Sequence, residues 1–411
     1  MIDLTRKQET VILAAVSLYG NDESALRSLS ELEQLVRTAG AAVLGKTVQK
    51  REAVDPATYV GSGKLTEIRQ MMDETGADGL VCDDELTPAQ ISSLSQALGC
   101  KVMDRTMVIL DIFARRASSA EGKVQVELAQ QRYRLSHLAG LGVSLSRLGG
   151  GIGTRGPGEK KLETDRRHIR SRISQLKREL EEIVQHRSVT RAGRQRSASS
   201  RIAIVGYTNA GKSTLLNRLT DAGVLEEDEL FATLDPTTRQ FITPGGQKIL
   251  LTDTVGFISK LPHNLIDAFR STLEEARYAD HIVHVLDASS PDIDEHIRVV
   301  YDTLYELGIR DKKILTIFNK MDLAGEDVRL TDPCADYTAA ASLKTGSGLD
   351  EICRQIEIMV RSTRKYISRV FPYSQAGLVQ RIRLYGELIS ESYEEDGIHI
   401  AAFVPEGYDR L

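Results

Sequence analysis

The chain has 411 residues, a net charge of −5 and 41% hydrophobic residues, which is enough for two to four domains of ~100–200 residues each. Its longest apolar run, Val11 to Leu18, is far shorter than the ~20 residues that span a bilayer, and no charged leader precedes a cleavage-like site. Because the four cysteines lie too far apart for a C-x-x-C pair or a zinc cluster, we expect a globular, cytoplasmic protein with reduced thiols and no stable membrane insertion.

Residues 1–106 alternate apolar runs with segments of helical periodicity, which predicts a small N-terminal domain with a parallel α/β sheet. The predicted elements are Thr10 to Leu18, Ala25 to Ala39, Tyr59 to Gly63 leading into Leu65 to Thr75, Gly79 to Cys82, Pro88 to Leu98 and Lys101 to Asp104. Gly61-Ser62-Gly63-Lys64 resembles a second phosphate loop, but Thr58 stands where the first glycine belongs and Leu65 where Ser or Thr belongs. A local turn is the favoured interpretation and a phosphate contact the alternative.

Residues 107–200 predict a helical hairpin subdomain. Met107 to Ala139 has helical periodicity, and apolar residues recur at helical intervals from Leu162 to Ile183. Between these segments, Gly140 to Gly158 contains eight glycines and cannot form a packed element. Such a loop can project from its domain into a narrow groove, or it is a disordered connection. Arg191 to Ser200 is rich in Arg, Ser and Gly and indicates a linker.

Positive charge is concentrated in this hairpin. Between Gly151 and Arg201 the chain has fourteen Lys or Arg residues against six Asp or Glu, a surplus of about +8 that leaves the remainder near −13. This distribution favours a surface that meets phosphate, with an ordinary solvated helix face as the alternative.

Residues 201–363 return to strands alternating with helices and predict a mostly parallel sheet with helices on both faces. The expected strands are Ile202 to Val205, Gln240 to Thr243, Lys248 to Leu251, His281 to Leu286, Lys313 to Phe318 and Ala335 to Ala340, with a hairpin turn at Pro244-Gly245-Gly246. Residues 364–411 predict a small α+β domain with strands at Ile367 to Phe371, Leu388 to Tyr393 and His399 to Val404 and a helix at Gln375 to Tyr385.

A glycine loop follows the first of these strands and opens a helix, in the order that a phosphate-binding P-loop requires. Its residues are Gly206, Tyr207, Thr208, Asn209, Ala210, Gly211, Lys212, Ser213 and Thr214. Backbone N–H groups and the helix dipole face the anion, Lys212 reaches the β- and γ-phosphates, and the Ser213 hydroxyl is placed on Mg²⁺. An ordinary strand-to-helix turn is the alternative.

Two further segments predict the magnesium and γ-phosphate contacts. One ends the strand at Leu251 and comprises Asp253, Thr254, Val255 and Gly256; its aspartate can hold Mg²⁺ through water, and its glycine N–H can sense the γ-phosphate. The other comprises Phe231, Ala232, Thr233, Leu234 and Asp235 and has the spacing of a first switch. Thr233 is the favoured metal ligand, and Thr237 and Thr238 are rivals. We expect Lys212, Thr233 and Gly256 to act in hydrolysis.

The base-reading element is predicted at Asn319, Lys320, Met321 and Asp322, which end another apolar strand. The Asp322 carboxylate can accept from guanine N1–H and the 2-amino group, both absent from adenine, while Asn319 helps at the N7/O6 edge and the Lys320 stem packs on the ring. Such a site discriminates by ~10⁴–10⁵, so GTP and GDP are expected over ATP. The loop Ser342, Leu343 and Lys344 contacts guanine O6 through backbone N–H groups.

These motifs resemble the P-loop GTPases of the translation-factor class, and nearly the whole chain resembles the HflX family. The resemblance is carried by the segments 104–106, 109–113, 123–129 and 146–159 and by the P-loop. It implies that the N-terminal domain and hairpin engage the large (50S) ribosomal subunit and its rRNA, with the glycine loop reaching toward the peptidyl-transferase region. It also implies a role in ribosome association and, in some members, splitting of stalled ribosomes. The chain departs from the family's Ser-Ala-Lys motif at Leu343.

Phe257 follows Gly256, where many GTPases carry a glutamine that orients the attacking water. We therefore expect slow GTP hydrolysis by the isolated protein and acceleration of hydrolysis by the ribosome. We also expect the free protein to be a monomer. Asn209 occupies the P-loop position where some related GTPases use an asparagine to help bind an activating K⁺. The alternative is that its side-chain amide only stabilises the loop. Two other functions stay open: an ATP-driven RNA-remodelling enzyme and a nucleotide-gated regulatory binding module.

Overall fold

The computed structural model describes residues 8–19, 21–146, 157–194, 200–220, 223, 230–260, 275–325 and 330–404. Contacts divide these residues into two compact units. One contains the described residues up to Ile183 together with Ser259 and Lys260, and the other contains those from Val184 to Ile258 and from Glu275 onward. No helix in this described part of the chain combines the length and the apolar character that crossing a membrane requires.

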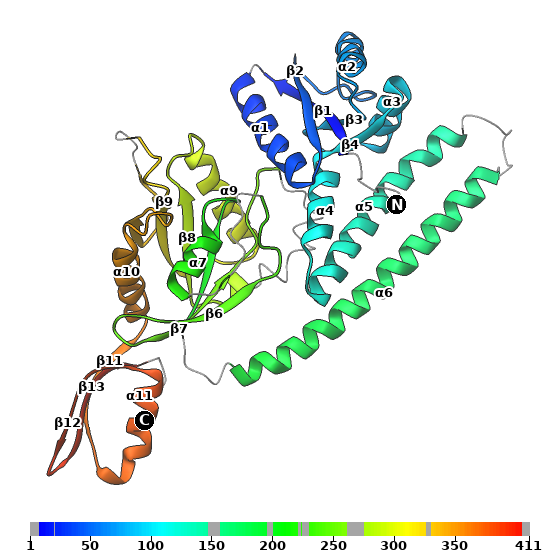
Figure 1. Cartoon of the computed structure of the whole chain (residues 1–411). Helices are drawn as coiled ribbons and strands as arrows, with labels where there is room; N and C mark the ends of the chain where they lie inside the picture. The colour runs from blue at the N-terminus through cyan, green and yellow to red at the C-terminus, as the bar shows by residue number, and fades with distance from the viewer. Residues whose placement is uncertain are drawn as a thin grey trace, which may run out of the picture. The chain divides into compact units, whose positions relative to one another are not determined.

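The first unit is built on a four-stranded parallel sheet in the order β2-β1-β3-β4 (Figure 1). Its strands are β1 (Thr10–Leu18), β2 (Ala42–Arg51), β3 (Gly79–Cys82) and β4 (Lys101–Asp104). Three helices connect them: α1 (Asp22–Thr38), α2 (Ser62–Thr75) and α3 (Pro88–Leu98). The predicted parallel α/β sheet is confirmed.

Alternation along β1 explains how the helices cover this sheet. Ile12, Ala14 and Val16 point into a core shared with Ile68 of α2 and Leu94 of α3, whereas α1 packs with β1 and β2. Local signals set the helix ends: Thr87 forms a capping box with Gln90 at the start of α3, and Gly76 and Gly99 end α2 and α3 in the left-handed conformation that favours glycine.

Gly61 and Lys64 belong to a local structure rather than to a second P-loop. Gly61 is the residue that precedes α2, and its N–H donates to Gln49 Oε1 at 2.8 Å. The Lys64 ammonium lies 2.7 Å from Glu67 and 3.2 Å from the Thr47 hydroxyl. The local turn is therefore wrong in detail, because Ser62, Gly63 and Lys64 form the first turn of α2.

The next three helices differ in part from the prediction, and the last of them begins in the first unit and continues past Ile183 into the second. They are α4 (Arg105–Arg116), α5 (Ala120–Ser146) and α6 (Pro157–Arg194). The helical character predicted from Met107 to Ala139 is confirmed except at residues 117–119, where the chain leaves the helix after Arg116. Ser119 Oγ then accepts the Gly122 N–H at 2.9 Å at the start of α5. The long helix predicted at Leu162 to Ile183 is confirmed within α6.

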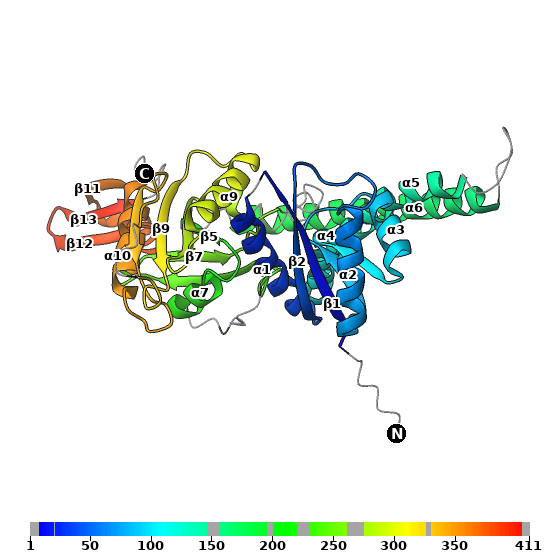
Figure 2. The same cartoon turned by 90° about the horizontal axis from the view of Figure 1, so that it is seen from above.

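The glycine-rich segment is helical at its start, since α5 continues to Ser146; its centre, residues 147–156, lies outside the described residues. The predicted linker at Arg191 to Ser200 is wrong up to Arg194, which is still in α6, and residues 195–199 are likewise outside the description. Helices α5 and α6 lie side by side (Figures 1 and 2). Arg172 of α6 joins them by two hydrogen bonds of 2.7 and 2.8 Å to the Glu127 carboxylate of α5.

The second unit contains a six-stranded sheet in the order β10-β9-β8-β5-β7-β6, in which only the β6–β7 pairing is antiparallel. Its strands are β5 (Ser200–Gly206), β6 (Thr237–Ile242), β7 (Lys248–Asp253), β8 (His281–Asp287), β9 (Lys313–Asn319) and β10 (Tyr337–Ala340). The predicted strands and the hairpin turn are confirmed to within a few residues.

Helices cover both faces of this sheet. Those with described bounds are α7 (Lys212–Thr220), α9 (Ile293–Glu306) and α10 (Leu349–Ser362). Ile202 and Ile204 of β5 face a core with Leu216 of α7 and Ile356 of α10, while α9 contacts β5 and β8 from the other side (Figure 2). The carboxyl ends of the parallel strands therefore share one edge, where polar loops can meet.

The chain ends in a small antiparallel sheet in the order β11-β13-β12. Its elements are β11 (Lys365–Phe371), η1 (Tyr373–Gln375), α11 (Ala376–Tyr385), β12 (Glu387–Glu394) and β13 (Gly397–Val404). Val379 and Ile382 of α11 pack on alternate residues of β11 and β13, including Ile367 and Ile400. The predicted α+β segment is confirmed.

Candidate nucleotide-binding site

The P-loop connects β5 to α7 through three unusual backbone positions. Gly206 has φ +154°, and a Cβ there would lie 2.3 Å from the Val285 carbonyl oxygen. Gly211 has φ +102°, and its Cβ would lie 2.3 Å from Asn319 Nδ2. Asn209 also has a positive φ, +58°. The two glycines are thus required by conformation and by close packing, and the loop leads directly into the first turn of α7.

Lys212 is nearly buried at the start of α7, and its ammonium donates to the Tyr207 carbonyl at 2.7 Å. Burial lowers the pKa of Lys212 to about 8, against the opposing attraction of Asp253. A Cβ at Gly256 would lie 3.0 Å from the Lys212 nitrogen. A desolvated cation beside an open glycine loop is well suited to an anionic ligand such as a polyphosphate.

Three oxygen-bearing side chains meet beside Lys212. Asp253 Oδ2 accepts from Ser213 Oγ at 2.8 Å and from Thr233 Oγ1 at 3.0 Å, and the two hydroxyls are 2.9 Å apart. Asp253 is fully buried, which raises its pKa, and its Oδ1 has no hydrogen-bond partner within the described residues. This all-oxygen set with an unsatisfied carboxylate oxygen fits a hard cation such as Mg²⁺.

The structure distinguishes among the three candidate threonines. Thr233 lies in the cluster with Ser213 and Asp253, whereas Thr237 and Thr238 belong to β6. The Thr238 hydroxyl is 2.9 Å from that of Thr252. This geometry favours Thr233.

At the other end of the site, Asn319 links loops instead of presenting a free amide. Its Nδ2 donates to the Ala210 carbonyl at 2.8 Å, and its Oδ1 accepts the Leu343 N–H at 3.0 Å. Asp322 accepts a 2.6 Å hydrogen bond from Ser342 Oγ, which lowers the pKa of its carboxyl group. Asn319 therefore positions the P-loop against the loop that contains Leu343. Asp322 is the exposed carboxylate at this end of the site.

A cleft of about 430 Å³ joins the two ends and brings most of the predicted residues together. The predicted residues that line it are Thr208, Asn209, Gly211, Lys212, Ser213, Thr214, Phe231, Ala232, Thr233, Gly256, Asn319, Lys320, Asp322, Leu343 and Lys344. The other predicted residues support it from the strand ends and loops: Gly206, Tyr207, Ala210, Leu234, Asp235, Asp253, Thr254, Val255, Met321 and Ser342. The cleft is of the size that small ligands use.

Several supporting contacts involve residues that the motifs do not identify. Tyr207 stacks on His296 of α9 with ring centroids 3.8 Å apart. Arg218 lines the cleft and donates to the Lys344 carbonyl at 2.9 Å, and Asp287 holds the Lys320 ammonium at 2.7 Å. Asp287 directly follows the apolar part of β8, which is a signal that sequence reasoning missed; Arg218 carries no such signal.

Phe257 occupies the position after Gly256 and is 2% exposed. Its backbone pairs with the P-loop, since Thr208 N–H donates to the Phe257 carbonyl at 2.8 Å and Phe257 N–H donates to the Gly206 carbonyl at 3.1 Å. A buried phenyl ring has no group that can orient a water molecule. The chain itself therefore offers no water-orienting side chain at this position.

The sheet, the P-loop at its edge and the loops that follow β7, β9 and β10 define a P-loop nucleotide-binding protein. Three family profiles match the chain in order. They are described as GTP-binding GTPase N-terminal over residues 26–114, GTP-binding GTPase middle region over 116–194, and 50S ribosome-binding GTPase over 201–320.

The chain is 59% identical to the GTPase HflX of Lacrimispora saccharolytica, over 98% of this chain and 96% of the relative. It is 38% identical to the GTPase HflX of Escherichia coli, over 93% and 90%. Among solved structures, it matches a GTP-binding protein from Sulfolobus solfataricus in complex with GDP at 25% identity and a TM-score of 0.45, covering 86% of this chain and 99% of that one. The chain belongs to the HflX family of GTPases, binds guanine nucleotide and hydrolyses GTP.

Proposed function

We propose that this GTPase binds the large ribosomal subunit in its GTP form and that hydrolysis allows release, with splitting of stalled ribosomes or control of translation or assembly as the outcome. The observation that carries the proposal is Phe257: the nucleotide site has no water-orienting side chain there, so rapid hydrolysis depends on a group supplied by a partner. The profile described as 50S ribosome-binding GTPase supports the large subunit as that partner.

The residues predicted from the sequence have these roles in the proposal. Lys212 and the P-loop N–H groups bind the phosphates, Thr233 and Gly256 contact the γ-phosphate, and Asp322 reads the base. Ser213, Thr233 and Asp253 hold Mg²⁺, directly or through water; the ion neutralises charge on the phosphates when bound. A comparison of GTP turnover rates in K⁺ and Na⁺ buffers tests whether Asn209 helps to bind K⁺. Equal rates in the two buffers would exclude that role.

Helix α6 supplies a basic surface for ribosomal RNA in this proposal. Arg167, Arg170, Lys177 and Arg178 are exposed on it, whereas Arg172 is paired with Glu127. In this proposal the chain has four domains, at residues 1–106, 107–200, 201–363 and 364–411. The basic surface of α6 belongs to the second of them, the hairpin subdomain. Phosphate contacts release counterions, so each contributes about one unit to the slope of log affinity against log salt.

Sedimentation of 50S subunits with the protein and GTP, GDP or a non-hydrolysable GTP analogue tests the proposal. We expect co-sedimentation with the analogue and loss of binding with GDP. Reversing Arg167 and Arg170 to Glu is expected to weaken binding and to reduce the salt slope by about two. The matched control reverses two exposed cations of the second unit, Lys248 and Arg298. Equal sedimentation with all three nucleotides would refute nucleotide control, and intact binding by the α6 variant would remove α6 from the interface.

A further inference from the structure

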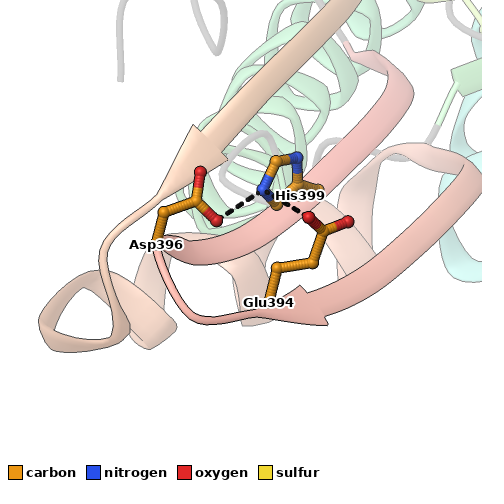
Figure 3. A group of neighbouring side chains, drawn as sticks. All are labelled: Glu394, Asp396 and His399. Atoms are coloured by element: carbon orange, nitrogen blue, oxygen red, sulfur yellow. Dashed lines mark hydrogen bonds and ion pairs between the residues drawn. The ribbon is translucent and has the colours of Figure 1, made fainter.

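The hairpin of β12 and β13 brings two carboxylates and an imidazole together at its turn (Figure 3). Glu394 pairs with Gly397 across a two-residue turn, and Ser392 pairs with His399. Because side chains alternate along each strand, Glu394 and His399 lie on the same face. This is the face opposite α11, since the intervening Ile398 and Ile400 point into the core that α11 covers. Asp396 reaches the same point from the turn.

Both carboxylates approach one imidazole nitrogen. His399 Nε2 lies 2.8 Å from Asp396 Oδ1 and 3.6 Å from Glu394 Oε2, and the three potential ligand atoms all lie within 4.8 Å of one another. Ligands at 2.0–2.2 Å from a tetrahedral zinc ion are about 3.3–3.6 Å from each other; the His399–Glu394 distance lies at the upper end of this range and the His399–Asp396 distance lies below it. An ion placed among these atoms would replace the contact between His399 and Asp396 and draw the three side chains to ligand spacing.

A supporting contact orients the glutamate, and the backbone fixes the turn. Ser392 Oγ donates to the other oxygen of Glu394, Oε1, at 3.1 Å, the kind of outer contact that orients ligating carboxylates in metal sites. Gly397, with φ +145°, lies so close to β11 that a Cβ would come within 2.6 Å of the Phe371 carbonyl oxygen. The hairpin end that carries the ligands is therefore held against the sheet.

We propose that Glu394, Asp396 and His399 form a second metal site, separate from the nucleotide site, for a divalent cation of the zinc class. One imidazole nitrogen and two carboxylate oxygens suit Zn²⁺, Co²⁺ or Ni²⁺ better than Mg²⁺, which prefers an all-oxygen shell. Binding releases any proton on His399 Nε2 to solvent, and water completes the coordination. The carboxylates are 57% and 63% exposed and the imidazole 34%, so the ion exchanges freely with solvent.

The test titrates the full chain, stripped of metal by a chelator and free of nucleotide, with Zn²⁺ in competition with a fluorescent zinc indicator. The wild type is expected to bind one equivalent that His399→Ala and Glu394→Gln bind at least about tenfold more weakly. Glu394→Gln is the sharper variant because it retains the His399 contact with Asp396. Glu395→Gln removes the same charge from the same turn without removing a ligand and is the matched control, expected to bind like the wild type.

Each remaining result overturns the proposal. If His399→Ala binds as many Zn²⁺ equivalents as tightly as the wild type, the zinc is held elsewhere, for instance on cysteine thiols, and the three side chains form only an ion pair. If Glu395→Gln weakens binding as much as Glu394→Gln, general charge and not coordination is responsible. Thermal melts without metal, expected to coincide for wild type and Glu394→Gln, show that the variant folds.

Discussion

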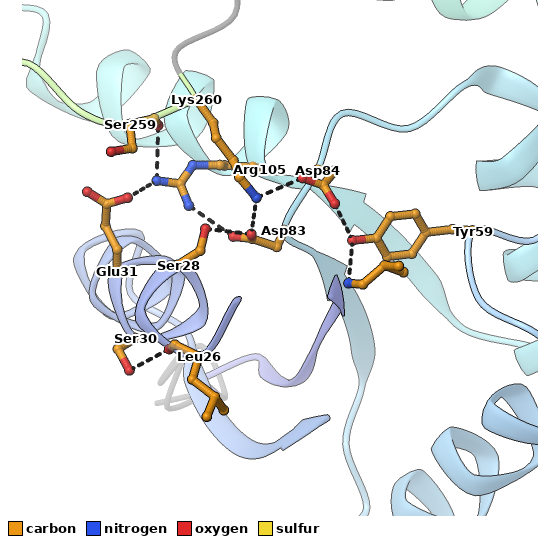
Figure 4. Close-up of polar contacts among 11 residues, drawn as sticks. Leu26, Ser28, Ser30, Glu31, Tyr59, Asp83, Asp84, Arg105, Ser259 and Lys260 are labelled. Atoms are coloured by element: carbon orange, nitrogen blue, oxygen red, sulfur yellow. Dashed lines mark hydrogen bonds and ion pairs between the residues drawn. The ribbon is translucent and has the colours of Figure 1, made fainter. Parts of the chain in front are cut away.

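Both units place charged side chains at the carboxyl edge of a parallel sheet, but the two edges differ in how those charges are paired. In the first unit, Arg105 has a 2% exposed side chain and forms ion pairs with Asp83 and Glu31. Its guanidinium also donates to the Ser259 carbonyl at 3.1 Å. Lys260 lies 2.5 Å from Asp83 and 2.8 Å from Asp84 (Figure 4). Asp83, Asp84 and Glu31 thus each have a cation partner, whereas the buried Asp104 at the end of β4 accepts hydrogen bonds from the Leu86 and Met107 N–H groups and the Tyr133 hydroxyl.

At the edge of the six-stranded sheet, the buried charges lack such partners. Lys212 donates to a carbonyl group, and Asp253 Oδ1 and Thr208 Oγ1 have no hydrogen-bond partner among the described residues. Burial lowers the pKa of Lys212 and raises that of Asp253. For Asp83, burial is outweighed by Lys260 and Arg105, so its pKa is lowered. Similar architecture thus gives a cluster of paired charges in one unit and a site suited to an anionic ligand in the other.

The largest expected effect concerns the nucleotide site and its selectivity for guanine over adenine. Wild-type protein is expected to prefer GTP to ATP by about 10⁴-fold, because an adenine leaves Asp322 without its two donors. Asp322→Ala removes the carboxylate that makes this distinction and should reduce the preference to within about tenfold. Competition of GTP and ATP against a fluorescent guanine nucleotide measures it. Asp311→Ala, in a loop away from the cleft, is the control; an unchanged preference in Asp322→Ala would remove that residue from base recognition.

The next largest effect concerns the paired charges around Arg105 in the first unit. Arg105→Met removes the cation between Asp83 and Glu31 while Lys260 still contacts Asp83, so the free energy of unfolding of the first unit should fall by about 3 kcal/mol, the lower end of the range for a broken buried ion pair. Denaturant unfolding, followed by a probe in that unit, measures this. Arg27→Met removes an exposed cation of α1 that pairs with Glu23 and should cost less than about 1 kcal/mol. Equal effects of the two variants would contradict the special role of Arg105.

A smaller effect compares one substitution at both edges. Asp83→Asn removes a carboxylate that two cations stabilise, so the free energy of unfolding should fall by about 1–3 kcal/mol. Asp253→Asn keeps an acceptor for Ser213 and Thr233 but removes a buried charge whose raised pKa shows that folding disfavours it. In nucleotide-free protein, Asp253→Asn should therefore leave stability unchanged or raise it by about 1 kcal/mol. Loss of stability in both variants would mean that the two edges are electrostatically alike.

Periodicity and capping residues in the sequence made most of the helices and strands predictable. The prediction failed where packing between distant segments determines the secondary structure. Strand β2 was not predicted, because Ala42–Arg51 mixes Gly, Lys and Gln among its apolar residues, as an edge strand with one neighbour tolerates. The break between α4 and α5 was missed although Ser118 and Ser119 lie in it, directly before α5, where serine is a signal for a new helix start.

The candidate site was predictable for a different reason. Its motifs, apart from the first-switch segment at residues 231–235, directly follow apolar strands, and parallel strands end at one edge, so sequence order alone implies that these loops meet. The hydrogen bonds of Asn319 to Ala210 and Leu343, and the contact of Arg218 with Lys344, join residues more than 20 positions apart. No local pattern specifies such pairings, so the structure was needed to find them.

The measurement that tests the central claim most directly is GTP turnover with and without purified 50S subunits under identical Mg²⁺ and salt. Because Phe257 cannot orient the attacking water, we expect slow turnover by the protein alone and an acceleration of ~10³-fold or more by the subunit, the range of catalytic groups supplied in trans. Lys212→Ala, measured in parallel, should show neither rate. A turnover rate that 50S subunits leave unchanged would contradict the account.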